Sequence, residues 1–271
     1  MTDATETSPR GSVRRTALLV IVGVIGGFLS GAFGVGGGFI MVPLLTGLVG
    51  LDQRRAAATS LLAIIPTSIA GAITYAVQGE VHVLASAILA AGGIVGSLIG
   101  TRLLRELPLG WLRWMFFGLL LIIAVRSVIE IPVRDAELDL QVGTILGLVA
   151  LGLVMGIASG LFGLGGGVIM VPVLVGIFGM GDLLAKGTSL LAIIPTSITG
   201  TVQNLRNKLV HWQDGAIAGI AATAASFLGV WMAFWIEPFW SAILFALLVV
   251  FVAAQMIVRD LRARRRKPAG N

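Results

Sequence analysis

The stretch TSLLAIIPTSIAG, residues 59–71, occurs a second time almost unchanged, as TSLLAIIPTSITG at residues 188–200. The two copies agree at 12 of 13 positions and lie 129 residues apart. At the same offset and without a gap, GAFGVGGGFIMVPLLTG (residues 31–47) aligns with GLFGLGGGVIMVPVLVG (residues 160–176). A self-match at a fixed period indicates internal repeats, and a period of about half the chain indicates two copies of one domain-sized unit.

The composition around these blocks is that of a membrane protein. Of the 271 residues, 57% are apolar and 12% are charged, with a mean hydropathy of +1.00, whereas soluble domains carry about 25% charged residues. The absence of cysteine excludes disulfides, thiolate metal sites and thiol catalysis. The net charge of +6 comes from basic residues beside apolar segments and in the terminal tail, so it indicates membrane topology rather than nucleic-acid binding.

Five apolar segments are predicted in each repeat, and most reach the roughly 20 residues that span a bilayer. The second segment of each repeat is shorter and opens with a glycine cluster. The first repeat contains Thr16–Phe33, Gly37–Gly50, Ala56–Val77, Val83–Leu104 and Trp111–Ile131. The second contains Gln141–Leu161, Gly166–Gly179, Leu184–Leu205, Trp212–Ile236 and Phe239–Val258.

The positive-inside rule favours a topology in which all ten segments cross. With a cytoplasmic amino terminus, 16 of the 19 basic residues then lie on the cytoplasmic side, and only Arg126, Arg134 and Lys186 lie outside. If the short segments dip in and return instead, eight segments cross and six basic residues move outside. Five crossings per repeat is an odd number, so the two copies have opposite orientation, an architecture of secondary transporters.

We therefore predict an all-α fold, a polytopic transmembrane helical protein with two inverted-topology repeats of about five segments each and about 8–10 transmembrane helices. A disordered cytoplasmic N-terminus (residues 1–15) precedes repeat 1 (16–131). A linker on the outer side (132–140) leads to repeat 2 (141–258) and a basic cytoplasmic tail (259–271). The expected location is the inner membrane with both termini in the cytoplasm. The lipid bilayer is the expected partner, and the oligomeric state is left open.

The glycine clusters are the first candidate binding elements. Two short apolar segments that are interrupted by glycine at matching positions point to a midplane site in a transporter. Glycine permits unusual backbone angles, and the helix that follows presents free N–H groups to an anion. Proline is expected to interrupt that helix further in. The alternative is that these glycines only allow helices to pack closely. The candidates are Gly34, Gly36, Gly37, Gly38 and Pro43, with Gly163, Gly165, Gly166, Gly167 and Pro172.

The repeated TSLLAIIPTS block supplies the second set of candidates. A proline inside a helix lacks an N–H and frees the carbonyl four residues earlier, which in a bilayer needs a partner inside the protein or in a water-filled cavity. Hydroxyl groups flank both predicted helix breaks. The alternative is a kinked helix whose hydroxyls bond to their own backbone. The candidates are Thr59, Ser60, Pro66, Thr67 and Ser68, with Thr188, Ser189, Pro195, Thr196 and Ser197.

Gln203 and Asn204 are further candidates, because they are strong donors near the end of a predicted segment. His82 and His211, at equivalent and hence opposite membrane edges, are interpreted as interfacial packing residues. No Asp, Glu or Lys is predicted deep in a segment, so a buried proton relay has no candidate. We find no catalytic triad, metal cluster or P-loop in the sequence, so we expect neither an enzyme nor a cofactor or metal.

At these residues the sequence resembles the sulfite exporter TauE/SafE family of membrane transporters. The resemblance rests on the doubled GxGGGxxMVPxL pattern at Gly34–Leu45 and Gly163–Leu174, each followed by its TSL…P…S block, and it extends roughly from Thr16 to Val258. It implies transport of a small sulfur-containing or carboxylate anion, such as sulfite or a sulfonate. The glycine motifs and the Thr/Ser–Pro blocks are the residues that it implies for the site.

The sequence thus predicts a secondary transporter, an exporter of sulfite or an organosulfonate, that works by alternating access at a midplane site between the repeats. An anion channel is an alternative, because pores and carriers share the same lining chemistry. A non-transporting membrane scaffold or sensor subunit is a second alternative. It would not need matched helix breaks, which makes it less favoured.

Overall fold

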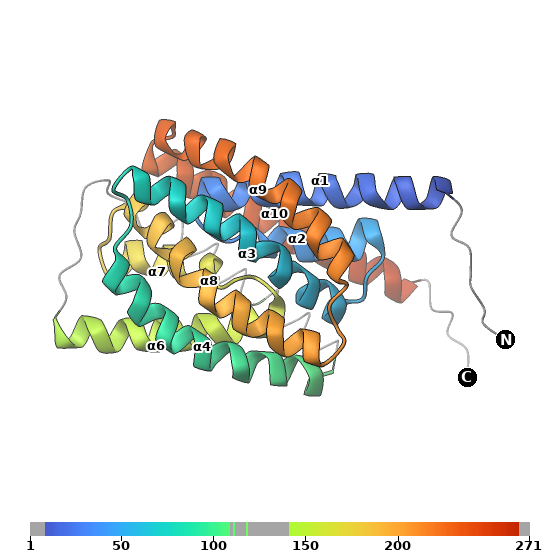
Figure 1. Ribbon diagram of the computed structural model, residues 1–271, viewed down its shortest axis with the longest axis horizontal. Coiled ribbons are helices and arrows are strands. Elements are labelled where there is room, and N and C mark those ends of the chain that lie inside the picture. The colour runs from blue at the N-terminus through green and yellow to red at the C-terminus, as the bar shows by residue number, and fades with distance from the viewer. Residues whose placement is uncertain (1–8, 109–110, 112–117, 119–140, 266–271) are drawn as a thin grey trace.

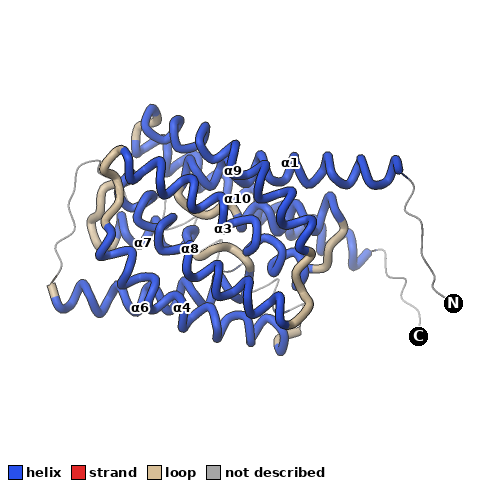
Figure 2. Tube along the Cα trace, viewed as in Figure 1, coloured by secondary structure: helices blue, strands red, loops and turns tan. Residues whose placement is uncertain are grey.

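The computed structural model describes residues 9–108, 111, 118 and 141–265, and this part of the chain is helical without a strand (Figures 1 and 2). In chain order the elements are α1 (Pro9–Phe33), α2 (Gly38–Leu44), the π-helix η1 (Leu45–Val49), α3 (Gln53–Val77), α4 (Val83–Glu106), α6 (Val142–Phe162), α7 (Gly167–Gly176), α8 (Asp182–Arg206), α9 (Trp212–Trp235) and α10 (Pro238–Arg265).

Six of these helices are long and apolar enough to cross a bilayer, which confirms the predicted polytopic all-α class. They are α1, α3, α4, α6, α8 and α9. The two glycine-opened segments form shorter apolar helices, and so does the described apolar part of α10. The predicted fifth segment of repeat 1 and the linker at 132–140 lie almost wholly outside the described residues.

Two helices extend beyond the predicted segments at the ends of the chain. Helix α1 begins at Pro9, so residues 9–15, which were predicted to be disordered, are helical. Proline at the first helical position is favourable because its missing N–H would have no intrahelical partner there. Helix α10 continues to Arg265, into the predicted tail, since arginine favours helix once a helix has begun.

Helices α3 and α8, which carry the repeated TSLLAIIPTS block, run antiparallel to each other in the middle of the bundle (Figure 1). The contacts at their ends establish this direction. The backbone N–H of His211, just after α8, donates to Thr59 Oγ1 near the start of α3 at 3.1 Å. Reciprocally, the N–H of His82, after α3, donates to Thr188 Oγ1 near the start of α8 at 3.0 Å. These reciprocal contacts are consistent with inverted repeats.

The outer helices pair across the repeats through small residues. Helix α1 packs on α9, and the equivalent α6 packs on α4. A Cβ atom at Gly27 of α1 would lie 2.0 Å from the Ala222 carbonyl oxygen, and one at the equivalent Gly156 of α6 would lie 2.3 Å from the Gly93 oxygen. Glycine is therefore required at both positions, because the helices touch backbone to backbone.

Several basic residues gather at one end of the bundle. Arg15 Nη2 lies 2.6 Å from Asp214 Oδ2, and Arg105 Nη1 donates to Asn207 Oδ1 at 3.1 Å. At the same end, Arg54 Nη2 donates to the Leu107 carbonyl at 2.8 Å. Residues that the positive-inside rule assigned to one side thus lie together, while His82 and the start of α8 lie at the other end.

Candidate functional site

Two glycine loops join α1 to α2 and α6 to α7, and they have the same backbone conformation. In the first loop Gly34, Gly36 and Gly37 have φ of 69°, 75° and 75°. In the second loop the equivalent residues Gly163, Gly165 and Gly166 have φ of 71°, 77° and 89°. Side chains other than glycine rarely adopt these left-handed angles. The loop glycines are therefore conformational requirements, as the sequence predicted.

The two loops pack directly against each other. A Cβ atom at Gly38 would lie 2.2 Å from the Gly163 carbonyl oxygen. In the reciprocal contact, one at Gly167 would lie 2.6 Å from Val35 Cα. Gly38 and Gly167 thus allow the backbone of each loop to approach the other. The glycine motifs of the two repeats, far apart in sequence, form one cluster.

Two isoleucines of the repeated block line this cluster. A Cβ atom at Gly36 would lie 3.3 Å from Ile64 Cγ2 and 3.4 Å from Ile193 Cδ1. One at Gly165 would lie 3.2 Å from Ile193 Cγ2 and 3.3 Å from Ile64 Cγ2. Both isoleucines are fully buried. Each loop therefore contacts α3 and α8 together.

Ser60 and Ser189 each form a hydrogen bond to the glycine loop of the opposite repeat. Ser60 Oγ of α3 donates to the Gly163 carbonyl at 2.7 Å. Ser189 Oγ of α8 makes the equivalent hydrogen bond to the Gly34 carbonyl. Both serines and both glycines are buried, so these bonds satisfy loop carbonyls inside the protein. The two predicted serines therefore have a positioning role.

The threonines of the block are also bonded to the protein. Thr59 and Thr188 accept the histidine N–H groups described above. Thr67 Oγ1 donates to the Ala63 carbonyl of its own helix at 2.8 Å, and Thr196 Oγ1 donates to the Ile193 carbonyl at 2.8 Å. For Thr67 and Thr196 the structure therefore shows the alternative named above, in which the hydroxyl bonds to the backbone of its own helix.

The proline residues do not interrupt the long helices, which corrects the predicted helix breaks. Helix α3 continues through Pro66, and α8 continues through Pro195. Packing on both sides holds these helices together, and the hydrogen bond lost at each proline is a local defect. Helix α7 likewise continues past Pro172, whereas α2 ends just after Pro43 and passes into the π-helix η1.

Ser68 and Ser197 differ from the other hydroxyls of the block. Both are fully buried, and neither Oγ atom has a hydrogen-bond partner among the described residues. The same holds for the equivalent pair Ser30 and Ser159, which lie on α1 and α6 just before the glycine loops. On α3, residues 60, 64 and 68 are four apart and share one face. Ser68 thus lies one helical turn beyond the isoleucine that contacts the loops.

Helix α8 extends this unpartnered polar surface toward its C-terminal end. Asn204 is fully buried, and neither its Nδ2 nor its Oδ1 atom has a partner within the described part of the chain. Thr201, one turn earlier on the same face, has an unpartnered hydroxyl as well. The predicted Gln203 is only half-buried. Burying an amide without hydrogen bonds is costly, so Asn204 is a strong candidate for contact with a polar ligand.

Sequence reasoning missed a buried ion pair at the start of α8. Lys186 Nζ donates to Asp182 Oδ2 at 2.7 Å and to Ser241 Oγ of α10 at 2.9 Å. Lys186 is 1% exposed and Asp182 is 4% exposed. Counting Lys186 as an external topology charge therefore overlooked its burial. The available signal was the i, i+4 spacing of an acid and a base at the start of an apolar helix.

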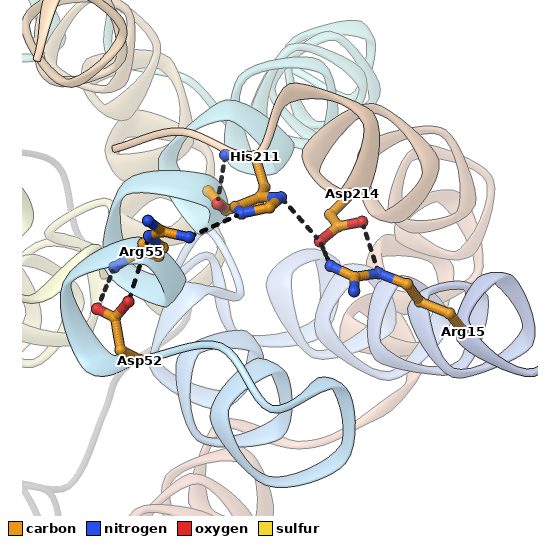
Figure 3. Close-up of polar contacts among 6 residues, drawn as sticks. Arg15, Asp52, Arg55, His211 and Asp214 are labelled. Atoms are coloured by element: carbon orange, nitrogen blue, oxygen red, sulfur yellow. Dashed lines mark hydrogen bonds and ion pairs between the residues drawn. The ribbon is translucent and has the colours of Figure 1, made fainter. Parts of the chain in front are cut away.

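A second charged network connects three helices at the end where the basic residues gather (Figure 3). His211 lies between Arg55 and Asp214, with Nε2 3.4 Å from Arg55 Nη1 and Nδ1 3.7 Å from Asp214 Oδ2. Asp214 also binds Arg15, and Arg55 lies 3.4 Å from Asp52. His211 is thus more than a packing residue. The equivalent His82 instead accepts the Ala85 N–H at 3.2 Å and caps α4.

No group of three or more His, Cys, Asp or Glu residues that could hold a metal ion occurs in the part of the chain described by the structure. The cluster of loops and helices offers backbone groups and hydroxyls, and a paired ammonium group lies beside the first loop. Groups of this kind can hydrogen-bond to small polar or anionic species.

Comparison with known proteins identifies the family and relatives of this chain. The family described as sulfite exporter TauE/SafE matches residues 3–127 and 148–271, two stretches that cover the two repeats. The chain is 32% identical over 207 residues to a probable membrane transporter protein of Xylella fastidiosa (strain 9a5c), covering 72% of this chain and 77% of the relative.

Similar relatives occur in other bacteria. The probable membrane transporter protein YdhB of Bacillus subtilis is 27% identical over 198 residues, covering 72% of this chain and 81% of the relative. A second Bacillus subtilis protein, the probable membrane transporter protein YunE, is 28% identical over 224 residues, covering 72% of this chain and 80% of that protein. No solved structure matches the chain. With both repeats matched and the doubled glycine loops in contact, the chain belongs to the sulfite exporter TauE/SafE family of membrane transporters.

Proposed function

We propose that this protein is a secondary transporter that moves a small anion, sulfite or an organosulfonate, outward across the inner membrane, with both of its termini in the cytoplasm. The anion binds where the two glycine loops meet α3 and α8. Family membership supports transport, and the family description supports sulfite as the first anion to test.

One observation carries the placement of the site. Ser68 and Ser197, at equivalent positions of the two repeats, are buried on helices that contact both loops, and their hydroxyls have no partner among the described residues. A buried hydroxyl without a partner is unfavourable unless something else bonds to it. An anion held between the repeats would accept both hydroxyl protons. Asn204 would add a third donor from α8.

The reciprocal contacts support an alternating-access cycle. Each loop bonds to a helix of the other repeat, and the helix ends are tied by equivalent hydrogen bonds at opposite ends of the bundle. If the two repeats exchange conformations, the hydrogen bonds that form at one membrane face have equivalents at the other face. Rocking of inverted repeats about a central site is how many secondary transporters expose it to one side at a time.

The test is flux in proteoliposomes of labelled sulfite, sulfonates and carboxylates. The wild-type protein is expected to show saturable flux of sulfite or a sulfonate. In the variant Ser68→Ala/Ser197→Ala, flux should fall at least tenfold, because a hydrogen bond to a charged group contributes about 1.5–3 kcal/mol. Stability should not fall, since neither hydroxyl has a partner among the residues that the structure describes.

A matched control is Thr223→Val, which removes a hydroxyl that is bonded to the Gly219 carbonyl of its own helix at 2.8 Å. This change should leave flux unaltered. Flux that follows voltage without saturation would instead identify an anion channel. The absence of flux for every anion would favour a scaffold or sensor subunit. Full flux in the double serine variant would show that the anion binds elsewhere.

A further inference from the structure

Three buried polar residues follow one another along a single face of α8. Ser197, Thr201 and Asn204 are spaced four and three residues apart, so their side chains lie one above the other. They are 0%, 3% and 0% exposed, and their hydroxyl and amide groups have no hydrogen-bond partner among the described residues. Because nearly all buried polar groups have partners, a row of three without one points to a ligand that supplies them.

Thr201 differs from other threonines of the long helices. Thr199, two residues earlier, donates its hydroxyl to the Pro195 carbonyl of α8 at 2.8 Å. Thr67 and Thr223 donate to carbonyls of their own helices at the same distance. A threonine inside a helix can usually form this bond to the carbonyl three or four residues earlier. Within the described residues the Thr201 hydroxyl makes no such bond, which leaves it available to a ligand.

The equivalent face of α3 is filled instead. Beyond Ser68 it continues to Ala72 and Tyr75, which occupy the positions of the threonine and the asparagine of α8. Tyr75 is fully buried, and its hydroxyl donates to the Gly31 carbonyl of α1 at 2.9 Å. After the serine, the face of α3 therefore presents a methyl group and a tyrosine that is bonded to the fold.

The two faces lead to opposite ends of the bundle, because α3 and α8 run antiparallel. The face of α8 leads to the end where the basic residues gather. There Arg105 Nη1 donates to Oδ1 of Asn207, which lies one turn beyond Asn204, at 3.1 Å. The unpartnered polar groups thus continue from the central serines toward the end that the proposed function places in the cytoplasm.

The described charges at this end favour an anion. Arg105, Arg206 and Lys208 are exposed. Three carboxylates at the same end each lie 3.4 Å or less from an arginine, which offsets their charge: Asp52, Glu106 and Asp214. Clustered positive charge raises the local concentration of anions. An anion in the cytoplasm is therefore drawn to the end of the bundle at which the polar face of α8 finishes.

Building on the proposed transport function, we propose that Thr201 and Asn204 form a second binding position for the transported oxyanion, on the cytoplasmic side of the central serines. The helix rises about 10 Å from Ser197 to Asn204, so an anion between the serines reaches Asn204 only with its outer edge. An anion one turn farther along α8 lies between Thr201 and Asn204. There the hydroxyl and Nδ2 donate to its oxygen atoms. The Oδ1 atom accepts from a water molecule that accompanies the anion.

Cysteine labelling tests this position directly, because the natural chain has no cysteine and each variant then carries one thiol. The full-length variants Thr201→Cys and Ala72→Cys are labelled in oriented membrane vesicles, from the side that carries the basic residues. The reagent is a methanethiosulfonate that bears a sulfonate group, so it is itself a small anion of the expected class. Thr201→Cys should react about tenfold faster than its equivalent Ala72→Cys or more, since a thiol without access is inert.

Selectivity and protection distinguish a binding position from a water-filled gap. The trimethylammonium form of the reagent is the matched cation. After correction for the rates of both reagents with a free thiol, Thr201→Cys should favour the sulfonate form about tenfold, because the path concentrates anions. Methanesulfonate should slow the labelling about tenfold at ten times its dissociation constant, and gluconate at the same ionic strength should not. Sulfite is unsuitable as the protecting anion, because it cleaves disulfides.

Two further variants show which residues hold the anion. Adding Asn204→Leu to Thr201→Cys should abolish the protection by methanesulfonate, because the remaining donor of the second position is removed. In Ser68→Ala/Ser197→Ala/Thr201→Cys the protection should persist, because only the central site is lost. Loss of protection in this triple variant would show that the anion has a single position at the serines, which would overturn the inference.

The outcomes separate this inference from the proposed function. If the wild-type protein moves no anion, the proposed function fails, whereas protection from labelling still decides whether Thr201 and Asn204 bind one. Equal labelling of Thr201→Cys and Ala72→Cys, or labelling without preference for the anionic reagent, would overturn the second position. Asn204→Cys allows the same measurements if Thr201→Cys does not fold.

Discussion

Repeat 1 and repeat 2 hold their glycine loops with equivalent hydrogen bonds, yet the residues just outside those loops differ in polarity. Residues 53, 57 and 75 of repeat 1 are Gln, Ala and Tyr, and the equivalents in repeat 2 are Asp182, Lys186 and Asn204. Tyr75 donates its hydroxyl to the Gly31 carbonyl at 2.9 Å, while the Asn204 amide has no partner in the described structure.

This comparison distinguishes residues that the fold of both repeats needs from residues that are particular to one repeat. Most of the positions described above that are alike in both repeats build the scaffold: they set backbone angles, allow close approach or satisfy loop carbonyls. Ser68 and Ser197 are also alike, and they are the exception because their hydroxyls have no partner among the described residues. At the positions that differ, the buried ion pair of Asp182 and Lys186 lies in repeat 2, and the equivalent residues of repeat 1, Gln53 and Ala57, are uncharged. If the repeats are inverted, the two ends of a shared site are then chemically unequal.

The largest effects are expected where the scaffold is symmetric. Gly27→Leu and Gly156→Leu each force a side chain into a backbone carbonyl of the facing helix. Overpacking usually costs about 1–3 kcal/mol, and because backbone cannot move aside we expect about 3 kcal/mol or more at both positions. Thermal unfolding of the purified variants measures this.

Gly143→Leu is the control for that comparison, since a Cβ atom there would meet nothing within 4 Å. It should unfold at the wild-type temperature. A severe defect at Gly27 with a mild one at Gly156 would show that the α1–α9 and α4–α6 pairs contribute unequally to stability.

A smaller and again symmetric effect is expected at the loop serines. Ser60→Ala and Ser189→Ala each leave a buried glycine carbonyl without its donor. An orphaned buried acceptor costs about 1–3 kcal/mol, so both variants should lose stability by that amount and to a similar degree. Melting temperatures compared side by side test the equality. A loss in only one variant would mean that the two loops are held by different contacts.

The smallest effects should have opposite signs. Tyr75→Phe loses the bond to Gly31 and should be destabilised by about 0.5–1.5 kcal/mol. Asn204→Leu removes a buried amide for which the described part of the chain holds no partner, so stability should stay level or rise by about 1 kcal/mol. Transport should fall in the asparagine variant alone. If Asn204→Leu destabilises the protein instead, Asn204 is bonded within the fold, and its candidacy for anion contact is lost.

The sequence predicted the scaffold well because its signals are local or repeated. Apolar length located the long helices, and glycine clusters located the left-handed turns, since few other residues adopt those angles. The sequence predicted helix continuity less well, because packing between helices decides it. Proline suggested interruptions at Pro66 and Pro195, but α3 and α8 stay helical there because the surrounding helices hold them.

The sequence by itself determined the class of molecule: a doubled, apolar, helical chain with glycine turns at matching positions, read from a 129-residue offset. Only the tertiary structure decided which polar groups are satisfied. Ser60 and Ser68 belong to one block, yet one bonds to the opposite loop and the other has no partner among the described residues. Lys186 is buried because Gly34 and Ser241, distant in sequence, enclose it. Burial depends on which segments meet, and a count of charges along the chain does not contain that information.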